Sequence, residues 1–382
     1  MDARDFDAVL TAVREFVAAE VVPAEQQIDE TDEVPARIRE RAAAMGLFGF
    51  ALPEEFGGLG LTMTEEVRLA FEIGVTTPAF RSMFATNNGL AGQVIVWNGT
   101  AGQQERYLPA IARGDIIASF ALTEPEAGSD PGGLTTSARR DGDSWIIEGA
   151  KRYITNAPVA DLFVVFARTA DGGPQSISAF LVDRDTPGLW VGPRDKKMGQ
   201  AGAWTGEVGF DGARVPAAAL LGEREGTGFT TAMRSLSRGR LHIAAVCVGL
   251  AQRLLMESAS YAGRRHQFGQ AIGQFQLVQG MLADSQTECY AGRAMVLEAA
   301  RHFDDGTDTR VGPSCCKYFC SEMAGRVADR AVQIFGGAGY MRGVAVERFY
   351  RDARVFRLYE GTSQVQQVII ARQVLRSGPL AL

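Results

Sequence analysis

Apolar residues recur at helical spacing through the first third of the chain. They stand three and four positions apart at Phe6, Val9, Leu10, Val13, Phe16 and Val17. Similar apolar stripes, divided by Pro and Gly, cover residues 35–45, 64–73, 85–98 and 103–112. This periodicity is typical of helices that bury one face. We therefore predict an N-terminal helical domain over residues 1–117.

From residue 118 to about residue 228 the pattern changes to short runs rich in Val, Ile, Phe and Trp. The clearest runs are 145–147, 162–166, 177–182 and 208–210. Turn formers separate them at Asp141-Gly142-Asp143, Asp171-Gly172-Gly173-Pro174 and Asp211-Gly212. Short strands joined by such turns predict an antiparallel β module, either a small barrel or a sandwich.

Long helical patterns return after Gly228. They cover 229–262, 273–303, 312–336 and 363–376, with Gly and Pro between them. Four long amphipathic helices predict a C-terminal four-helix bundle over residues 229–382. The predicted fold class is therefore mainly α with a central β domain.

Composition excludes several classes of function. The net charge of -6 over 382 residues argues against a nucleic-acid surface. The charged N-terminus is not a signal peptide, and the apolar stretch 243–255 is shorter than the ~20 residues of a membrane span, so we expect a cytoplasmic protein that enters no membrane. The five cysteines form no CxxC pair and only three histidines are present, so we expect no metal site and reduced thiols.

Three segments carry the candidate chemistry. They are Ala121-Leu122-Thr123-Glu124-Pro125-Glu126-Ala127-Gly128-Ser129-Asp130, Gln333-Ile334-Phe335-Gly336-Gly337-Ala338-Gly339-Tyr340 and Tyr359-Glu360-Gly361-Thr362-Ser363-Gln364. Together, and in this order, they resemble the acyl-CoA dehydrogenase family of flavoenzymes over nearly the whole chain. The resemblance implies an N-terminal helical domain, a β-barrel, a C-terminal four-helix bundle, bound FAD, and assembly as a homotetramer or homodimer.

The resemblance also implies a set of flavin-binding residues. Those that would bind the flavin of their own subunit are Phe120, Leu122, Thr123, Ser129, Tyr153 and Thr155, and many relatives carry Trp at the position of Tyr153. Those that would reach the flavin of a neighbouring subunit are Arg265, Phe268, Gln276, Gln333, Gly336 and Gly337. Thr362 and Gln364 would complete the site. Gly336 and Gly337 could instead simply end a helix, and residues 153–155 could instead be a plain β-strand. Both alternatives to a flavin-binding role stay open.

Glu360 is the candidate catalytic base. Desaturating a thioester between Cα and Cβ requires a base at Cα and a hydride acceptor at Cβ. A carboxylate is a weak base toward carbon in water, and burial beside an apolar acyl chain strengthens it. By resemblance, the backbone N–H of Glu360 and a flavin hydroxyl bind the thioester carbonyl. Some branches of the family place the base on a bundle helix, where this chain has Gly239.

The candidate substrate-binding residues are Ser129, Ser237, Arg240, Gly361 and Arg81. Many relatives have Asp at the position of Ser237. Phe80-Arg81-Ser82 resembles the Tyr-Arg-Ser of glutaryl-CoA dehydrogenases, whose arginine binds a distal carboxylate, and Glu72 stands upstream much as a pocket glutamate does in that branch. An acyl group with a terminal acid is therefore one hypothesis; a helix cap or a subunit contact is the alternative role of Arg81.

The leading interpretation is FAD-dependent dehydrogenation of an acyl-CoA to a trans-2-enoyl-CoA, as in fatty-acid β-oxidation, with electrons passed to an electron-transfer flavoprotein. One alternative is an oxidase that reoxidises the flavin with O₂. Another is a catalytically silent helical assembly module of the same shape. The sequence leaves the acyl chain length, its branching and the number of subunits open.

Overall fold

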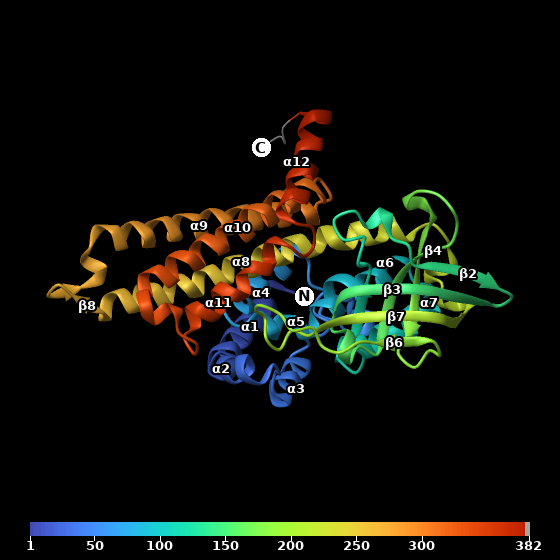
Figure 1. Ribbon diagram of the computed structural model, residues 1–382, viewed down its shortest axis with the longest axis horizontal. Helices are drawn as coiled ribbons and strands as arrows, with labels where there is room; N and C mark the ends of the chain where they lie inside the picture. The colour runs from blue at the N-terminus through green and yellow to red at the C-terminus, as the bar shows by residue number, and fades with distance from the viewer. Residues whose placement is uncertain (379–382) are drawn as a thin grey trace.

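The computed structural model describes residues 1–378. Helices form one end and one side of the molecule, and a β domain forms the other end (Figure 1). This arrangement confirms the predicted fold class, a mainly α protein with a central, curled β sheet.

Seven α-helices make up the N-terminal part. They are α1 (Ala3–Phe16), α2 (Val22–Thr31), α3 (Ala36–Ala44), α4 (Met63–Ile73), α5 (Pro78–Ala85), α6 (Ala91–Asn98) and α7 (Ala101–Arg113). Thr62 and Thr100 each begin a helix with a capping box, completed by Glu65 and Gln103. Such side chains satisfy backbone N–H groups that have no partner inside the helix.

The predicted single segment 85–98 is interrupted by a π turn over Thr86–Leu90, which separates α5 from α6. Two buried asparagines in this turn bind backbone groups of other segments. Asn87 accepts from the N–H of Ala118 at 2.8 Å, and Asn88 accepts from the N–H of Ala51 at 2.9 Å. These long-range bonds anchor a widened turn that apolar periodicity alone cannot reveal.

The β domain holds seven strands in one sheet. They are β1 (Ala118–Ala121), β2 (Ser137–Asp141), β3 (Ser144–Thr155), β4 (Leu162–Arg168), β5 (Ile177–Asp183), β6 (Leu189–Val191) and β7 (Thr205–Pro216). The order is β1-β4-β2-β3-β7-β6, with β5 paired to β4. The β1–β4 pair is parallel, so the sheet is mixed and not purely antiparallel as predicted.

The C-terminal part contains α8 (Gly228–Arg264), α9 (Gln276–Asp304), α10 (Val311–Phe335), α11 (Ala345–Ala353) and α12 (Ser363–Ser377). A short hairpin of β8 (His266–Gln267) and β9 (Gln270–Ala271) joins α8 to α9. The helices α8, α9 and α10 run side by side, with α4 packed on α8 (Figure 1). Their small and aliphatic side chains form one continuous core.

Helix α8 has the length and apolar composition that a membrane crossing needs. However, 61% of its most apolar window is buried inside the molecule, as is usual for the central helix of a bundle. No other helix within residues 1–378 passes the same test.

Candidate active site

A cavity of about 240 Å³ lies where the three parts of the chain meet. Helix α5 contributes Arg81, the β domain contributes its β1–β2 loop and the end of β3, and α8 contributes Arg240. Among the predicted site residues, those that line it are Arg81, Phe120, Leu122, Thr123, Ser129, Tyr153, Thr155, Arg240, Glu360 and Gly361. Segments more than 200 residues apart in the sequence thus converge on one space.

Glu360 presents its carboxylate to this cavity. Its side chain is 8% exposed, and its Oε2 atom is buried without a hydrogen-bond partner. Glu360 has φ 54° and Gly361 has φ 88°, two successive left-handed residues. A non-glycine residue adopts this conformation only when its surroundings hold it there. The backbone therefore holds the Glu360 side chain in a fixed position, with one carboxylate oxygen that has no hydrogen-bond partner.

Three cations surround the Glu360 segment. Arg81 approaches the carboxylate itself, with its Nη2 3.6 Å from Glu360 Oε1. Arg240 Nε donates to the Glu360 carbonyl at 3.4 Å, and Lys317 Nζ donates to the Gly361 carbonyl at 2.6 Å. Burial lowers the pKa of Arg240 and lowers that of Lys317 to about 8. Positive charge thus gathers around the Glu360 segment, and Arg81 and Arg240 bring it to the cavity itself, where it favours negatively charged groups.

A second cavity of about 370 Å³ adjoins the first, and Arg81, Thr155 and Tyr359 line both. The second cavity alone, and the two cavities together, fall within the roughly 300–1,000 Å³ of small-molecule sites. Tyr153 is 64% exposed at φ 58°, and the guanidinium of Arg152 lies 4.8 Å from its ring. The Tyr153 ring, predicted to lie against the flavin, is thus found at the edge of the cavity.

A buried ion pair fixes the loop that follows β1. Lys151 Nζ donates to Glu124 Oε1 at 2.7 Å and to the Leu122 carbonyl at 3.3 Å. Glu124 also accepts from the backbone N–H groups of Thr135 and Thr136. Burial lowers the pKa of Lys151 to about 8, whereas Lys151 and these donors overcome burial and lower the pKa of Glu124 to about 2. The pair ties β3 to the loop that lines the cavity.

Other predicted residues do not line this cavity. Arg265, Phe268, Gln276, Gln333, Gly336 and Gly337 lie at or near the end of the bundle farthest from the β domain (Figure 1). Phe268 is 93% exposed. Their role at a neighbouring subunit's flavin therefore stays a prediction. Thr362 caps α12 by accepting from the N–H of Val365, and Gln364 is exposed on the first turn of that helix.

Two expectations for the acyl site are changed by the structure. Ser237 donates to the Met233 carbonyl at 3.1 Å and does not line the cavity. The suggestion that Glu72 is a pocket glutamate is wrong, because Glu72 binds Arg14 through two hydrogen bonds of 3.0 and 2.8 Å beside a different cavity. Arg14 stands 58 positions away, so no local sequence pattern reveals this pair.

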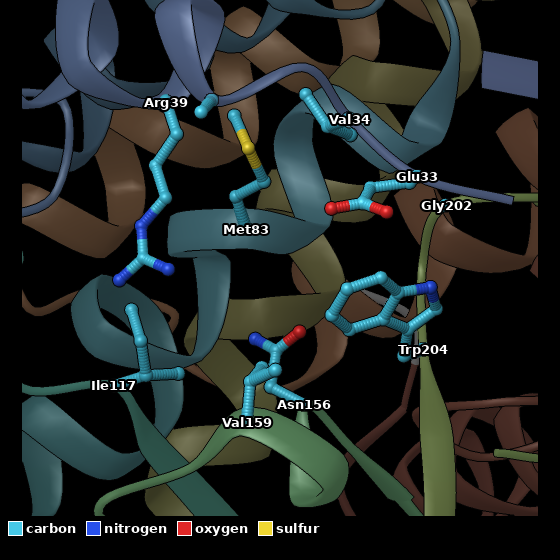
Figure 2. A pocket seen from close by; sticks show the side chains of 10 residues that line it. Glu33, Val34, Arg39, Met83, Ile117, Asn156, Val159, Gly202 and Trp204 are labelled. Carbon is cyan, nitrogen blue, oxygen red and sulfur yellow. The ribbon is translucent and has the colours of Figure 1, made fainter. Parts of the chain in front are cut away.

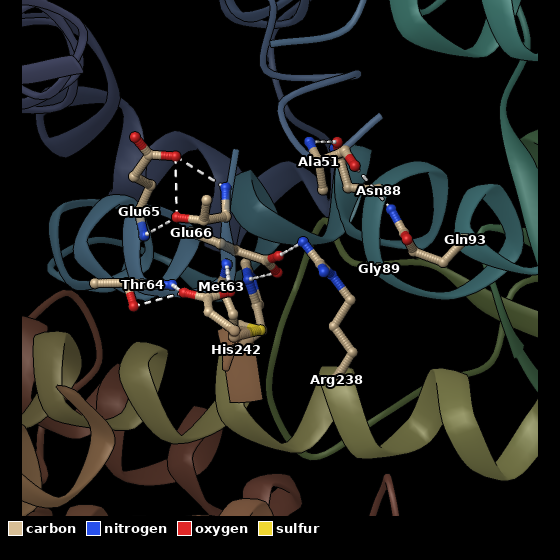
Figure 3. Close-up of polar contacts among 12 residues, drawn as sticks. Ala51, Met63, Thr64, Glu65, Glu66, Asn88, Gly89, Gln93, Arg238 and His242 are labelled. Atoms are coloured by element: carbon tan, nitrogen blue, oxygen red, sulfur yellow. Dashed lines mark hydrogen bonds and ion pairs between the residues drawn. The ribbon is translucent and has the colours of Figure 1, made fainter. Parts of the chain in front are cut away.

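The buried glutamate on α4 is instead Glu66, which the sequence analysis missed. Figure 3 shows Arg238 and His242 of α8 reaching toward it. His242 Nδ1 lies 2.9 Å from Glu66 Oε1. Burial acts to raise the pKa of Glu66, but Arg238 and His242 outweigh it and hold that pKa below its usual value. Glu66, Arg238 and His242 thus join α4 to α8.

A separate cavity of about 160 Å³ lies between the N-terminal helices and the β domain (Figure 2). Glu33, Arg39, Asn156 and Trp204 are among the side chains around it. It shares no lining residue with the Glu360 cavity, and none of the predicted site residues lines it. The chemistry is therefore assigned to the Glu360 cavity.

Three family models match the chain in succession: the acyl-CoA dehydrogenase N-terminal domain at residues 4–115, the middle domain at 119–213 and the C-terminal domain at 226–375. The chain belongs to the acyl-CoA dehydrogenase family. Members of the acyl-CoA dehydrogenase family are FAD-dependent oxidoreductases, which confirms the predicted enzyme class and cofactor.

Individual relatives cover nearly the whole chain. An acyl-CoA dehydrogenase of Bacillus subtilis is 39% identical over 95% of this chain and 96% of its own. The caffeyl-CoA reductase–Etf complex subunit CarC of Acetobacterium woodii is 38% identical over 92% of each chain. The structure of butyryl-CoA dehydrogenase from Megasphaera elsdenii has a TM-score of 0.93 at 32% identity, and covers 97% of this chain and 98% of that one.

The cavity walls fit the flavin that this family carries. Thr123 and Thr155 bring hydroxyl groups, and Leu122 brings backbone groups that could meet a polar ring edge. Gly128 has open space where a side chain would stand, so its backbone is accessible beside Ser129. The β1–β2 loop and the end of β3 are therefore the segments of this chain suited to hold the ring.

Proposed function

We propose that the protein is an acyl-CoA dehydrogenase that removes one hydrogen from each of Cα and Cβ of an acyl-CoA and forms a trans-2-enoyl-CoA. The observation that carries the proposal is Glu360, a buried carboxylate that lines the cavity and has one oxygen without a hydrogen-bond partner. In this reaction the Glu360 carboxylate takes the Cα hydrogen as a proton. The bound FAD supplies a hydride acceptor for the hydrogen on Cβ.

The other residues bind and orient the substrate. The backbone N–H of Glu360 is proposed to donate to the thioester carbonyl, which stabilises the negative charge that develops as Cα loses its proton. Arg240 is 5% exposed and offers positive charge to the CoA portion. Ser129 lines the same cavity from the β1–β2 loop. Enclosing the reacting carbons between these walls keeps water away from the carboxylate.

The proposed electron acceptor is an electron-transfer flavoprotein. One close relative is named as a subunit of a reductase–Etf complex, which supports this partner over O₂. We further propose a homotetramer or homodimer, because large apolar side chains are exposed along the bundle at Phe268, Leu277 and Tyr340.

The test is anaerobic addition of a panel of acyl-CoAs to the purified yellow protein. The proposal expects the flavin absorbance near 450 nm to bleach with at least one member, and expects electron-transfer flavoprotein to restore it. Rapid consumption of O₂ with substrate would instead identify an oxidase. A protein that binds no FAD would contradict both.

A second proposal concerns the acyl group, for which a terminal acid is the candidate. Arg81 is only 9% exposed, lies within α5 and lines the cavity, which supports a role inside the pocket over a helix cap or a subunit contact. Its Nε atom is buried and has no partner, although Glu360 lies near its Nη2. A buried guanidinium left partly unsatisfied favours a ligand that brings a carboxylate.

A further inference from the structure

The backbone on both sides of the Glu360–Gly361 peptide is held by side chains from three helices. Gln366 of α12 donates to the Glu360 carbonyl at 3.1 Å and to the Gly361 carbonyl at 2.9 Å. Lys317 of α10 donates to the Gly361 carbonyl at 2.6 Å, and Arg240 of α8 donates to the Glu360 carbonyl at 3.4 Å. Of these three donors, only Arg240 was predicted as a site residue from the sequence.

These hydrogen bonds hold the backbone in a conformation that it would not keep by itself. Both Glu360 and Gly361 are left-handed, and an unconstrained glutamate prefers other regions of φ and ψ. The Glu360–Gly361 peptide is bonded to the Cα atom that carries the Glu360 side chain, so rotating this peptide would re-aim the carboxylate. The carbonyl bonds therefore determine where the candidate base stands relative to the cavity.

Lys317 is unusual among these donors. Its side chain is fully buried. Within residues 1–378, no carboxylate oxygen lies within 4.0 Å of its Nζ, and its short polar contact is the Gly361 carbonyl. Burying an ammonium group against a neutral carbonyl is costly, so its presence here is poorly explained by stability alone.

The charged and titratable groups around Lys317 come from every packed element. Glu360 and Arg240 border it from the cavity side, Cys247 from α8 and Glu322 from its own helix. Glu322 is already engaged, since it accepts from Ser363 Oγ and from Arg357. Lys317 is thus the donor that links α10 directly to the residue after the base.

We propose that Lys317, with Gln366, is a positioning residue that fixes the Glu360–Gly361 peptides in the conformation needed for proton removal. Neither side chain lines the cavity, so each acts through the backbone and not by touching the substrate. This inference rests on the proposed function of Glu360 and adds residues to it.

The first test is Lys317→Met, which removes the donor and keeps most of the volume. A misplacement of about 1 Å costs on the order of 100-fold in rate, so we expect kcat to fall by 10- to 100-fold while KM and FAD content change less than threefold. The kinetic isotope effect with acyl-CoA deuterated at Cα should rise, because proton removal becomes slower than the other steps.

Hydrogen exchange gives a readout that does not need turnover. Amide exchange in peptides spanning residues 356–366 should be faster in Lys317→Met than in the wild type. The matched control is Ser314→Ala on the same helix, whose hydroxyl is also fully buried but donates to the Arg310 carbonyl. It should leave kcat, the isotope effect and exchange at 356–366 unchanged.

Gln366→Leu is the second variant, and it keeps the proposal testable if Lys317→Met does not fold. It should lower kcat and raise the isotope effect in the same way. A wild-type kcat in either folded variant overturns the positioning role. An activity loss that is fully explained by a lower FAD content or by less folded protein overturns it too. If no acyl-CoA reduces the flavin of the wild type, the proposed function itself is contradicted. Faster amide exchange at residues 356–366 in the variants would still establish that Lys317 and Gln366 anchor this segment.

Discussion

Gly239 of α8 faces the carboxylate of Glu360 so closely that no side chain fits between them. A Cβ atom built on Gly239 would stand well inside van der Waals distance of Glu360 Oε2. This is the position at which other branches of the family carry their base. In this chain α8 has no side chain at Gly239, and the carboxylate of Glu360 occupies that volume. A base at position 239 and the present placement of Glu360 therefore exclude each other.

Gly239→Ala should therefore push Glu360 out of place. We expect kcat to fall about 100-fold, with FAD still bound, because the collision is local to the carboxylate. The measurement is flavin reduction in stopped flow. Gly102→Ala is the control, since Gly102 lies on the exposed side of α7 and a Cβ there meets nothing within 4 Å. Wild-type reduction rates in Gly239→Ala would show that Glu360 has room to move without loss.

Arg81→Met tests the terminal-acid proposal. Losing a charge-assisted bond of about 1.5–3 kcal/mol should lower kcat/KM for glutaryl-CoA by roughly 10- to 150-fold. The change should be within a few-fold for butyryl-CoA and isobutyryl-CoA. Because Arg81 also lies beside Glu360, the informative quantity is the ratio between substrates and not the rate with one of them. If the enzyme turned over only butyryl-CoA and isobutyryl-CoA, and Arg81→Met left those rates unchanged, the terminal-acid proposal would be wrong.

The Glu124–Lys151 pair predicts a specific pH dependence of stability. The pKa of Glu124 is lowered from 4.5 to about 2 on folding, so its stabilising contribution is complete above pH 4.5 and is lost as pH falls toward 2. The loss amounts to about 2 kcal/mol by pH 3. Hence the difference in unfolding free energy between the wild type and Glu124→Gln should shrink by that amount between pH 6 and pH 3. A difference that stays constant over this range would contradict the pairing.

The long helices could be predicted from the sequence because their apolar periodicity is local. The predicted segments 229–262 and 312–336 differ from α8 and α10 by at most two residues at either end. The π turn at Thr86–Leu90 could not be predicted, since it depends on asparagine bonds to backbone groups more than 20 residues away.

Similar reasoning explains which site residues were found. Glu360 and the residues after β1 were identified because they stand in compact motifs, and the structure brings them to one cavity. Lys317 and Gln366 were missed because they bind backbone carbonyls, which leave no pattern of residue types. Glu72 was misread because its partner Arg14 lies on another helix. The role of the residues around Phe268 at a neighbouring subunit's flavin stays a prediction, because one chain alone holds no contact that tests it.

The most direct test of the account is anaerobic reduction of the flavin by a reactive acyl-CoA in the wild type and in Glu360→Gln. The amide keeps the size of the side chain but cannot accept the Cα proton. The account predicts that the variant binds FAD and substrate normally while flavin bleaching slows by at least about 1,000-fold, the scale of a general base. Bleaching at a rate close to that of the wild type would contradict the assignment of Glu360 as the base.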